Sequence, residues 1–255
     1  MMLASIRHPQ RQWRAHKQQP QGKLRNVNNI LTATVFVIGV SIVTYLAVTG
    51  KATATEIVFR GMQFILMIVL LQAPSVLRLR YRIEVPPLLS AVVLLFAFTA
   101  LVLGDGMDFY GRFTWWDKLL HAESGVLLSM VAMWLIHVIM AENDKYIYFN
   151  KYFLVLFLIM FSLGMGALWE ILEYTYDSIA GTNSQQFMES TTSSIILPDD
   201  TALSGHAALC DTMTDLILDL AGATLVAVYG LINHDKIVER YYLLVEQRKQ
   251  QLQAV

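Results

Sequence analysis

The chain has 255 residues, of which 55% are hydrophobic and only 15% are charged. This composition excludes an ordinary water-soluble domain and indicates a protein that is surrounded largely by lipid. The formal net charge of -1 gives no reason to expect nucleic acid as a partner, and the single cysteine, Cys210, excludes an internal disulfide framework.

The first 29 residues form a basic segment without acidic residues. Its positive charges are Arg7, Arg11, Arg14, Lys17, Lys23 and Arg25. A transit peptide has a similar composition, but the first apolar run, Ile30–Val48, is longer than the core of a signal peptide, and further apolar runs follow it. We therefore interpret residues 1–29 as a cytoplasmic tail that precedes a signal anchor.

Six apolar runs reach or approach the length of about 20 helical residues that crosses a hydrocarbon core of about 30 Å. They are Ile30–Val48, Ile57–Val76, Pro87–Leu103, Trp116–Met140, Tyr152–Trp169 with a polar helical extension to Asp177, and Asp211–Ile232. The sequence therefore predicts an all-α, polytopic bundle of six transmembrane helices over residues 30–233, followed by a cytoplasmic tail over residues 234–255.

The loops between these runs alternate in charge. Basic residues follow every second span. They are Arg78, Arg80 and Arg82 after the second span, Lys145 and Lys151 after the fourth, and Lys236, Arg240, Arg248 and Lys249 in the C-terminal segment after the sixth. By the positive-inside rule both termini are cytoplasmic, which agrees with an even number of spans. The long loop over residues 181–208, which lacks Lys and Arg, is then on the outer side.

Polar side chains recur at helical spacing near the outer ends of three spans. They are Asp117 and His121 on the fourth span, Glu170, Glu173 and Asp177 on the fifth, and Asp211, Asp215 and Asp219 on the sixth. Positions that face water at the interface explain Asp177 and Asp211. A carboxylate as deep as Asp219 costs about 2.5–3.5 kcal/mol in lipid and should face the bundle interior. We therefore expect one shared site near the outer leaflet.

The seven carboxyl groups of this set cannot all remain ionised without nearby positive charge. Arg60, Arg112 and Lys118 are the candidate bases, and they are too few to balance the acids. Oxygen ligands favour Mg, Mn or Ca, whereas His121 also admits Zn or Fe. We predict that all eight side chains of the set hold a divalent cation, and protonated carboxyl groups are the alternative.

Three segments in order, WWDKLLHAESG, GALWEILEYTYD and DTMTDLILDLAGA, resemble the YjdF-like family of bacterial inner-membrane proteins. The resemblance covers residues 30–232 and implies a multi-pass protein of the bacterial cytoplasmic membrane. The pattern is more distantly similar to VanZ-like proteins, which also carry an Asp-Lys-Leu-Leu-His element, here Asp117–His121. Asp219 stands where the VanZ-like pattern has Asn.

Three functions fit such a site. A metal-dependent enzyme would act from the outer face on a lipid-linked or envelope phosphoester, with His121 as a ligand or general base and Arg60 on a phosphate oxygen. A cation- or proton-coupled transporter also uses intramembrane acids. A structural or sensing protein would use the metal to hold the last three spans together. The inner halves of these spans contain few polar groups, which favours a site that is open to one side.

Overall fold

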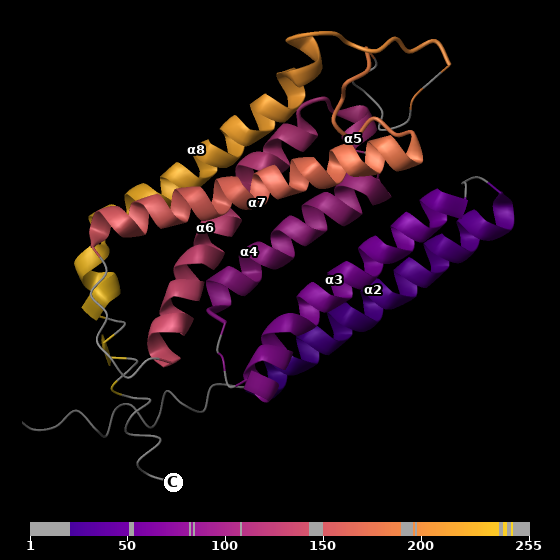
Figure 1. Cartoon of the computed structure of the whole chain (residues 1–255). Coiled ribbons are helices and arrows are strands. Elements are labelled where there is room, and N and C mark those ends of the chain that lie inside the picture. Colours follow the sequence, from indigo (N-terminus) through magenta and orange to yellow (C-terminus); the bar gives the residue numbers. More distant parts are fainter. Residues whose placement is uncertain are drawn as a thin grey trace, which may run out of the picture. The chain divides into compact units, whose positions relative to one another are not determined.

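The computed structural model describes residues 21–50, 54–81, 83, 85–107, 109–142, 150–189, 196, 198–239, 242–243 and 246. In chain order its elements are α2 (Gln21–Thr49), α3 (Ala54–Tyr81), α4 (Pro87–Ala97), the π-helix η2 (Phe98–Gly106), α5 (Phe109–Arg112), α6 (Trp116–Glu142), α7 (Lys151–Ala180), the short 3-10 helix η3 (Ala207–Leu209) and α8 (Cys210–Ile232) (Figure 1). All of these elements are helical, so the predicted all-α class is confirmed.

Within the described residues, six helical segments are long and apolar enough to cross a membrane. They are Thr32–Thr49, Arg60–Tyr81, Pro87–Gly104, Trp116–Ile139, Lys151–Ala180 and Ala207–Ile232. Each coincides with one of the predicted apolar runs, which confirms the polytopic bundle. Parts of several predictions lie outside the described residues: most of the N-terminal tail, the loop residues Arg82 and Lys145, part of the loop over residues 181–208, and most of the C-terminal tail.

The described chain forms two compact units, residues 1–76 and residues 77–255, of which the first contains α2 and most of α3. Within the first unit the two helices pack closely at Gly39. A Cβ atom at this position would lie only 2.7 Å from the Phe64 ring. The Gln72 side-chain amide donates a hydrogen bond of 2.8 Å to the Thr32 hydroxyl. Such interhelical hydrogen bonds are the usual role of glutamine within a span.

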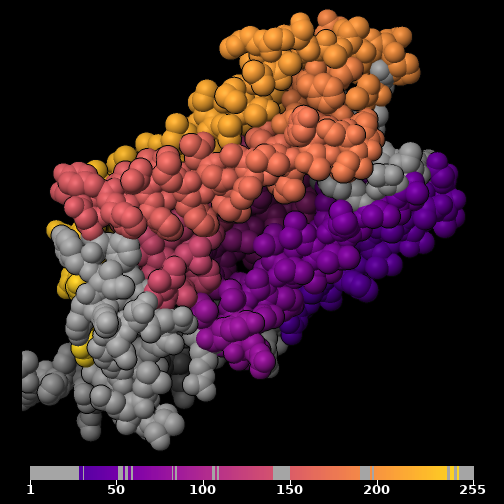
Figure 2. All heavy atoms as spheres, viewed as in Figure 1, coloured from indigo at the N-terminus to yellow at the C-terminus, as the bar shows by residue number. Residues whose placement is uncertain are grey.

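The second unit is built around α6, α7 and α8, which all contact one another. Helix α7 runs antiparallel to the other two, and Figure 2 shows its side chains packed along those of α8 as a continuous surface. An apolar cluster joins the three helices away from the start of α6. It consists of Ala132, Ile136, Leu154, Leu158 and Ala227.

Glycines allow the backbones of α6 and α8 to approach each other closely. A Cβ atom at Gly125 would collide with the main-chain oxygen of Asp219, and one at Gly222 would collide with that of Ala122. On α7, a Cβ atom at Gly166 would collide with the Asp219 carboxylate. Small residues thus provide the close helix contacts expected of a transmembrane bundle.

Replacing Gly125 by alanine is expected to destabilise the second unit, because the new methyl group must displace the backbone of α8. Overpacking of this kind costs about 1–3 kcal/mol. Gly164→Ala is the matched control on α7, since a Cβ atom there has no neighbour within 4 Å. Thermal unfolding in detergent should show a lower melting temperature for Gly125→Ala and little change or a slight increase for Gly164→Ala. Equal melting temperatures would contradict the close approach of α6 and α8.

Candidate metal centre

The candidate site lies where α6 and α8 begin and where the antiparallel helix α7 approaches its end (Figure 1). On α6 the i, i+4 spacing places Asp117 and His121 on one face. On α8 the same spacing aligns Asp215 with Asp219, and both are buried, with exposures of 1% and 0%. Helix α7 contributes Glu170, which is 5% exposed.

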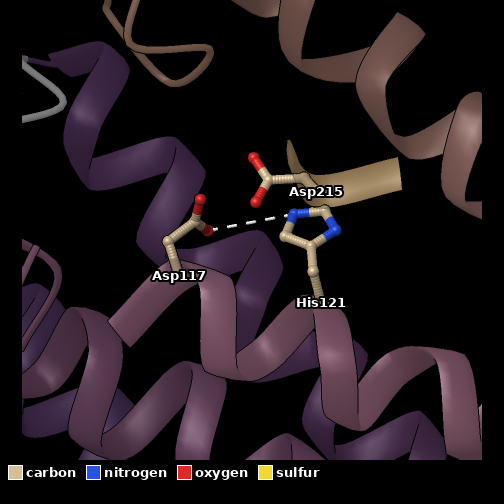
Figure 3. Close-up of side chains that lie close together, drawn as sticks. All are labelled: Asp117, His121 and Asp215. Atoms are coloured by element: carbon tan, nitrogen blue, oxygen red, sulfur yellow. Dashed lines mark ion pairs between the residues drawn. The ribbon is translucent and has the colours of Figure 1, made fainter. Parts of the chain in front are cut away.

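Three of these residues form a group whose ligand atoms lie close enough to share an ion. One ligand atom each from Asp117, His121 and Asp215 lies within 4.8 Å of the others. Figure 3 shows these side chains directed toward one another, with both carboxylates lying to the same side of the imidazole ring. The dashed line marks the distance of 4.0 Å between His121 Nε2 and Asp117 Oδ1.

Glu170 extends this group from α7. Its Oε1 atom lies 3.8 Å from His121 Nε2. In the described part of the structure, neither this atom nor Asp215 Oδ1 has a hydrogen-bond partner, although both are buried. A buried polar atom without a partner is costly, so two such oxygens beside one imidazole favour binding of a cation or a proton between them.

Asp219 lies on the other side of the imidazole. Its Oδ2 atom is 3.4 Å from His121 Nδ1. Its Oδ1 atom accepts a hydrogen bond from the Ser124 hydroxyl. The glycine at position 166 leaves the space that the Asp219 carboxylate occupies. Asp219 therefore belongs to the cluster and contacts protein groups through both oxygens.

The other predicted ligands have partners of their own. Asp211 forms an ion pair with Lys118, with 2.7 Å between Nζ and Oδ1, so this lysine is the counter-charge of Asp211. Glu173 accepts a hydrogen bond of 2.9 Å from the Trp169 indole nitrogen on the same helix. Asp177 binds the loop that follows α7.

The Asp177 carboxylate accepts three hydrogen bonds from this loop. The donors are the Thr182 hydroxyl at 2.6 Å, the Ser184 amide at 2.7 Å and the Gln185 amide at 2.9 Å. These bonds turn the chain back toward the cluster after α7 ends at Gly181, whose φ of 67° is left-handed. The structure thus brings together Asp117, His121, Glu170, Asp215 and Asp219. Arg60 belongs to the first unit, and its proposed role stays a prediction.

A family model for "Predicted membrane protein (DUF2238)" matches residues 31–236, a range that contains every residue of the cluster. The chain belongs to the DUF2238 family. An uncharacterized protein of Thermotoga maritima is 29% identical to it over 139 residues, which are 54% of this chain and 59% of that protein. The chain thus matches less than two thirds of the length of this relative. No solved structure matches the chain.

Two residues that position the acids in this DUF2238 protein were not predicted. Ser124 follows His121 by three residues, so helical spacing would have placed it on the same face. Gln185 lies in the loop after α7, and its side-chain amide reaches Glu170 Oε2 at 3.3 Å and the Thr212 hydroxyl at 3.2 Å. No periodic pattern marks a loop residue, so the sequence contained no signal for Gln185.

A further acid in the DUF2238 chain, Glu123, faces away from the cluster. Its Oε2 atom lies 3.2 Å from the hydroxyl of Thr99, which is in the π-helix η2. Within the cluster itself, the carboxyl groups of Asp117, Glu170, Asp215 and Asp219 surround a single imidazole. Since Lys118 is paired with Asp211, the cluster has an excess of negative groups that a divalent cation would offset.

Proposed function

We propose that this membrane protein binds one divalent cation between α6, α7 and α8. Asp117, His121 and Asp215 would be ligands, and Glu170 would complete the set. The observation that carries the proposal is the convergence of these side chains, together with two buried oxygens, Asp215 Oδ1 and Glu170 Oε1, that have no hydrogen bond among the described residues. Three carboxylates and one imidazole suit Mn²⁺, which accepts both ligand types, and Mg²⁺ is the next candidate.

We further propose that the protein is a metal-dependent enzyme that acts on a lipid-linked or envelope phosphoester. An ion of this kind prefers six ligands, so four protein side chains would leave two positions for water or a substrate oxygen. When bound, the cation would polarise a phosphoryl oxygen as a Lewis acid. The position near the first turns of α6 and α8 suits a substrate whose headgroup lies at the membrane surface.

A cation- or proton-coupled transporter is less well supported. A transport path needs polar groups along the whole span. Beyond the cluster, the described parts of α6, α7 and α8 are joined by the apolar core around Leu158 and Ala227. The buried hydroxyls of Ser129 and Ser162 there donate to the backbone oxygens of Leu158 and Gly125.

A structural role for the cation is the second candidate. Structural metal sites are usually closed, and the burial of His121, Glu170 and Asp215 favours a closed site. In that case the ion would hold α6, α7 and α8 together without chemistry. A bound Mn²⁺ that exchanges water rapidly would favour the enzyme, and one without a bound water would favour the structural role.

We also propose the location of the protein and the orientation of the site. The bacterial cytoplasmic membrane is supported by the resemblance of three segments to YjdF-like and VanZ-like proteins. The alternating basic loops support cytoplasmic termini, which would place the cluster at the outer leaflet. Basic residues at the end of α3, Arg78 and Arg80, belong to this pattern.

Titration of the metal-free protein with Mn²⁺ tests the cation site. The purified chain in nanodiscs, after treatment with a chelator, is expected to bind one Mn²⁺ per chain, because one group of ligands converges. The electron paramagnetic resonance signal of free Mn²⁺ measures binding, and competition with Mg²⁺ and Ca²⁺ gives the selectivity. A free Mn²⁺ signal that equals that of protein-free nanodiscs would contradict the proposal.

A further inference from the structure

The two nitrogens of His121 face different carboxyl groups. Nδ1 lies 3.4 Å from Asp219 Oδ2, within hydrogen-bond distance. Nε2 lies on the other side of the ring, 4.0 Å from Asp117 Oδ1 and 3.8 Å from Glu170 Oε1. Both of these distances are longer than a hydrogen bond and leave room for an atom between the groups.

Asp219 differs from the other acids of the cluster in its own contacts. Its Oδ1 atom accepts a hydrogen bond from the Ser124 hydroxyl, and its Oδ2 atom faces the imidazole. By contrast, Asp215 Oδ1 and Glu170 Oε1 have no hydrogen-bond partner among the described residues. Asp219 is also absent from the group whose ligand atoms lie within 4.8 Å of one another.

The backbone of α8 holds Asp219 in a fixed position. Gly125 on α6 contacts its main chain, and Gly166 on α7 contacts its carboxylate so closely that neither glycine could carry a side chain. Asp219 itself is 0% exposed. The carboxylate therefore has little freedom to turn away from the imidazole toward the other ligands.

We propose that Asp219 is a positioning residue that accepts the Nδ1 proton of His121 and so directs the unprotonated Nε2 toward the cation. This role rests on the cation site proposed above, and it removes Asp219 from the predicted set of direct ligands. A histidine ligand usually donates its second ring N–H to such a carboxylate, which fixes the tautomer and the ring orientation. Loss of the partner typically weakens metal affinity by about 10–100-fold.

Two substitutions separate a positioning residue from a ligand. Asp219→Asn keeps an oxygen that can accept the Nδ1 proton but removes the negative charge that a hard cation requires. Asp219→Leu keeps the branched shape and removes both acceptors. If Asp219 positions His121, Mn²⁺ affinity should stay within a few-fold of wild type in Asp219→Asn and fall by about 10–100-fold in Asp219→Leu. If Asp219 is a ligand, both variants should lose the ion, which is also the result expected for Asp215→Asn.

The protonation of the ring gives a readout that a general loss of stability would not change. In protein labelled with ¹⁵N-histidine, His121 should carry a proton on Nδ1 without metal, and again with Zn²⁺, a diamagnetic substitute for Mn²⁺. In the Zn²⁺ complex Nε2 should have no proton. A His121→Gln sample assigns the signals.

A proton on Nε2 alone, in either state of the wild type, would overturn the positioning role, as would loss of the ion in Asp219→Asn. Failure of the wild type to bind Mn²⁺ would instead remove the cation site. The ¹⁵N spectrum would still show whether Nδ1 carries a proton in the metal-free protein. Failure of the cation site and failure of the positioning role are therefore distinguishable. If Asp219→Leu does not fold, the wild-type spectra and Asp219→Asn decide the question.

Discussion

Replacing Asp215 by asparagine is expected to abolish the stabilisation that Mn²⁺ gives to the purified protein. The amide keeps the shape of the side chain but removes a charge that holds the ion. At a concentration of 100 times the Kd, a ligand that binds only the folded state stabilises it by about 2.7 kcal/mol. Wild type should therefore melt at a clearly higher temperature with Mn²⁺ than with chelator, and Asp215→Asn should melt at the same temperature in both.

The metal-free state makes this prediction sharper. Without a cation, Asp215→Asn should be as stable as wild type or more stable, because it removes a buried carboxylate with an unpaired oxygen. Asp199→Asn, in the exposed part of the loop before α8, is the matched control and should respond to Mn²⁺ like wild type. A wild-type melting temperature that is indifferent to Mg²⁺, Mn²⁺, Ca²⁺ and Zn²⁺ would favour carboxyl groups neutralised by protons.

Replacing Asp177 by alanine is expected to release the loop that follows α7. The variant loses all three hydrogen bonds that the carboxylate accepts from Thr182, Ser184 and Gln185. A hydrogen bond to a charged group contributes about 1.5–3 kcal/mol. Hydrogen exchange of residues 181–189 should accelerate at least about tenfold, which corresponds to about 1.4 kcal/mol of local stability.

Release of this loop should also weaken the metal cluster, because the Gln185 side-chain amide donates a hydrogen bond to Glu170 Oε2. Mn²⁺ binding should weaken in Asp177→Ala but should not disappear, since Asp177 itself does not face the imidazole. Asp177→Asn keeps one acceptor oxygen, so its exchange rate and its Mn²⁺ affinity should lie between those of wild type and Asp177→Ala. Unchanged exchange in residues 181–189 would show that the hydrogen bonds of Asp177 do not hold the loop, and complete loss of Mn²⁺ would make Asp177 a ligand.

The sequence predicted the helices well because hydropathy over about 20 residues reports directly on burial in lipid. It also predicted the convergence of Asp117, His121, Glu170, Asp215 and Asp219, since helical spacing and depth depend on only rise and rotation per residue. The depth of a side chain in the bilayer and its angle around the helix do not reveal which hydrogen-bond or ion-pair partners it has. The sequence therefore did not separate these residues from Asp211, which pairs with Lys118.

Non-helical and irregular segments limited the prediction elsewhere. The loop after α7 turns back through a left-handed Gly181, and neither this turn nor the contacts of Gln185 follow from a periodic pattern. The predicted span Pro87–Leu103 includes most of η2, but the π-helical geometry of this part was not predicted. A π-helix has i→i+5 hydrogen bonds, so it shifts the faces of a span without changing its hydropathy.

The burial of Asp215 and Asp219 on α8 has a consequence for biosynthesis. Helix α8 is the last of the six candidate spans, so α6 and α7 leave the ribosome before it. If α8 entered the bilayer alone, each carboxylate at depth would cost about 2.5–3.5 kcal/mol. Contact with His121, Ser124 and Gly125 removes these groups from lipid, so we expect integration of the nascent α8 to be coupled to its docking on α6 and α7.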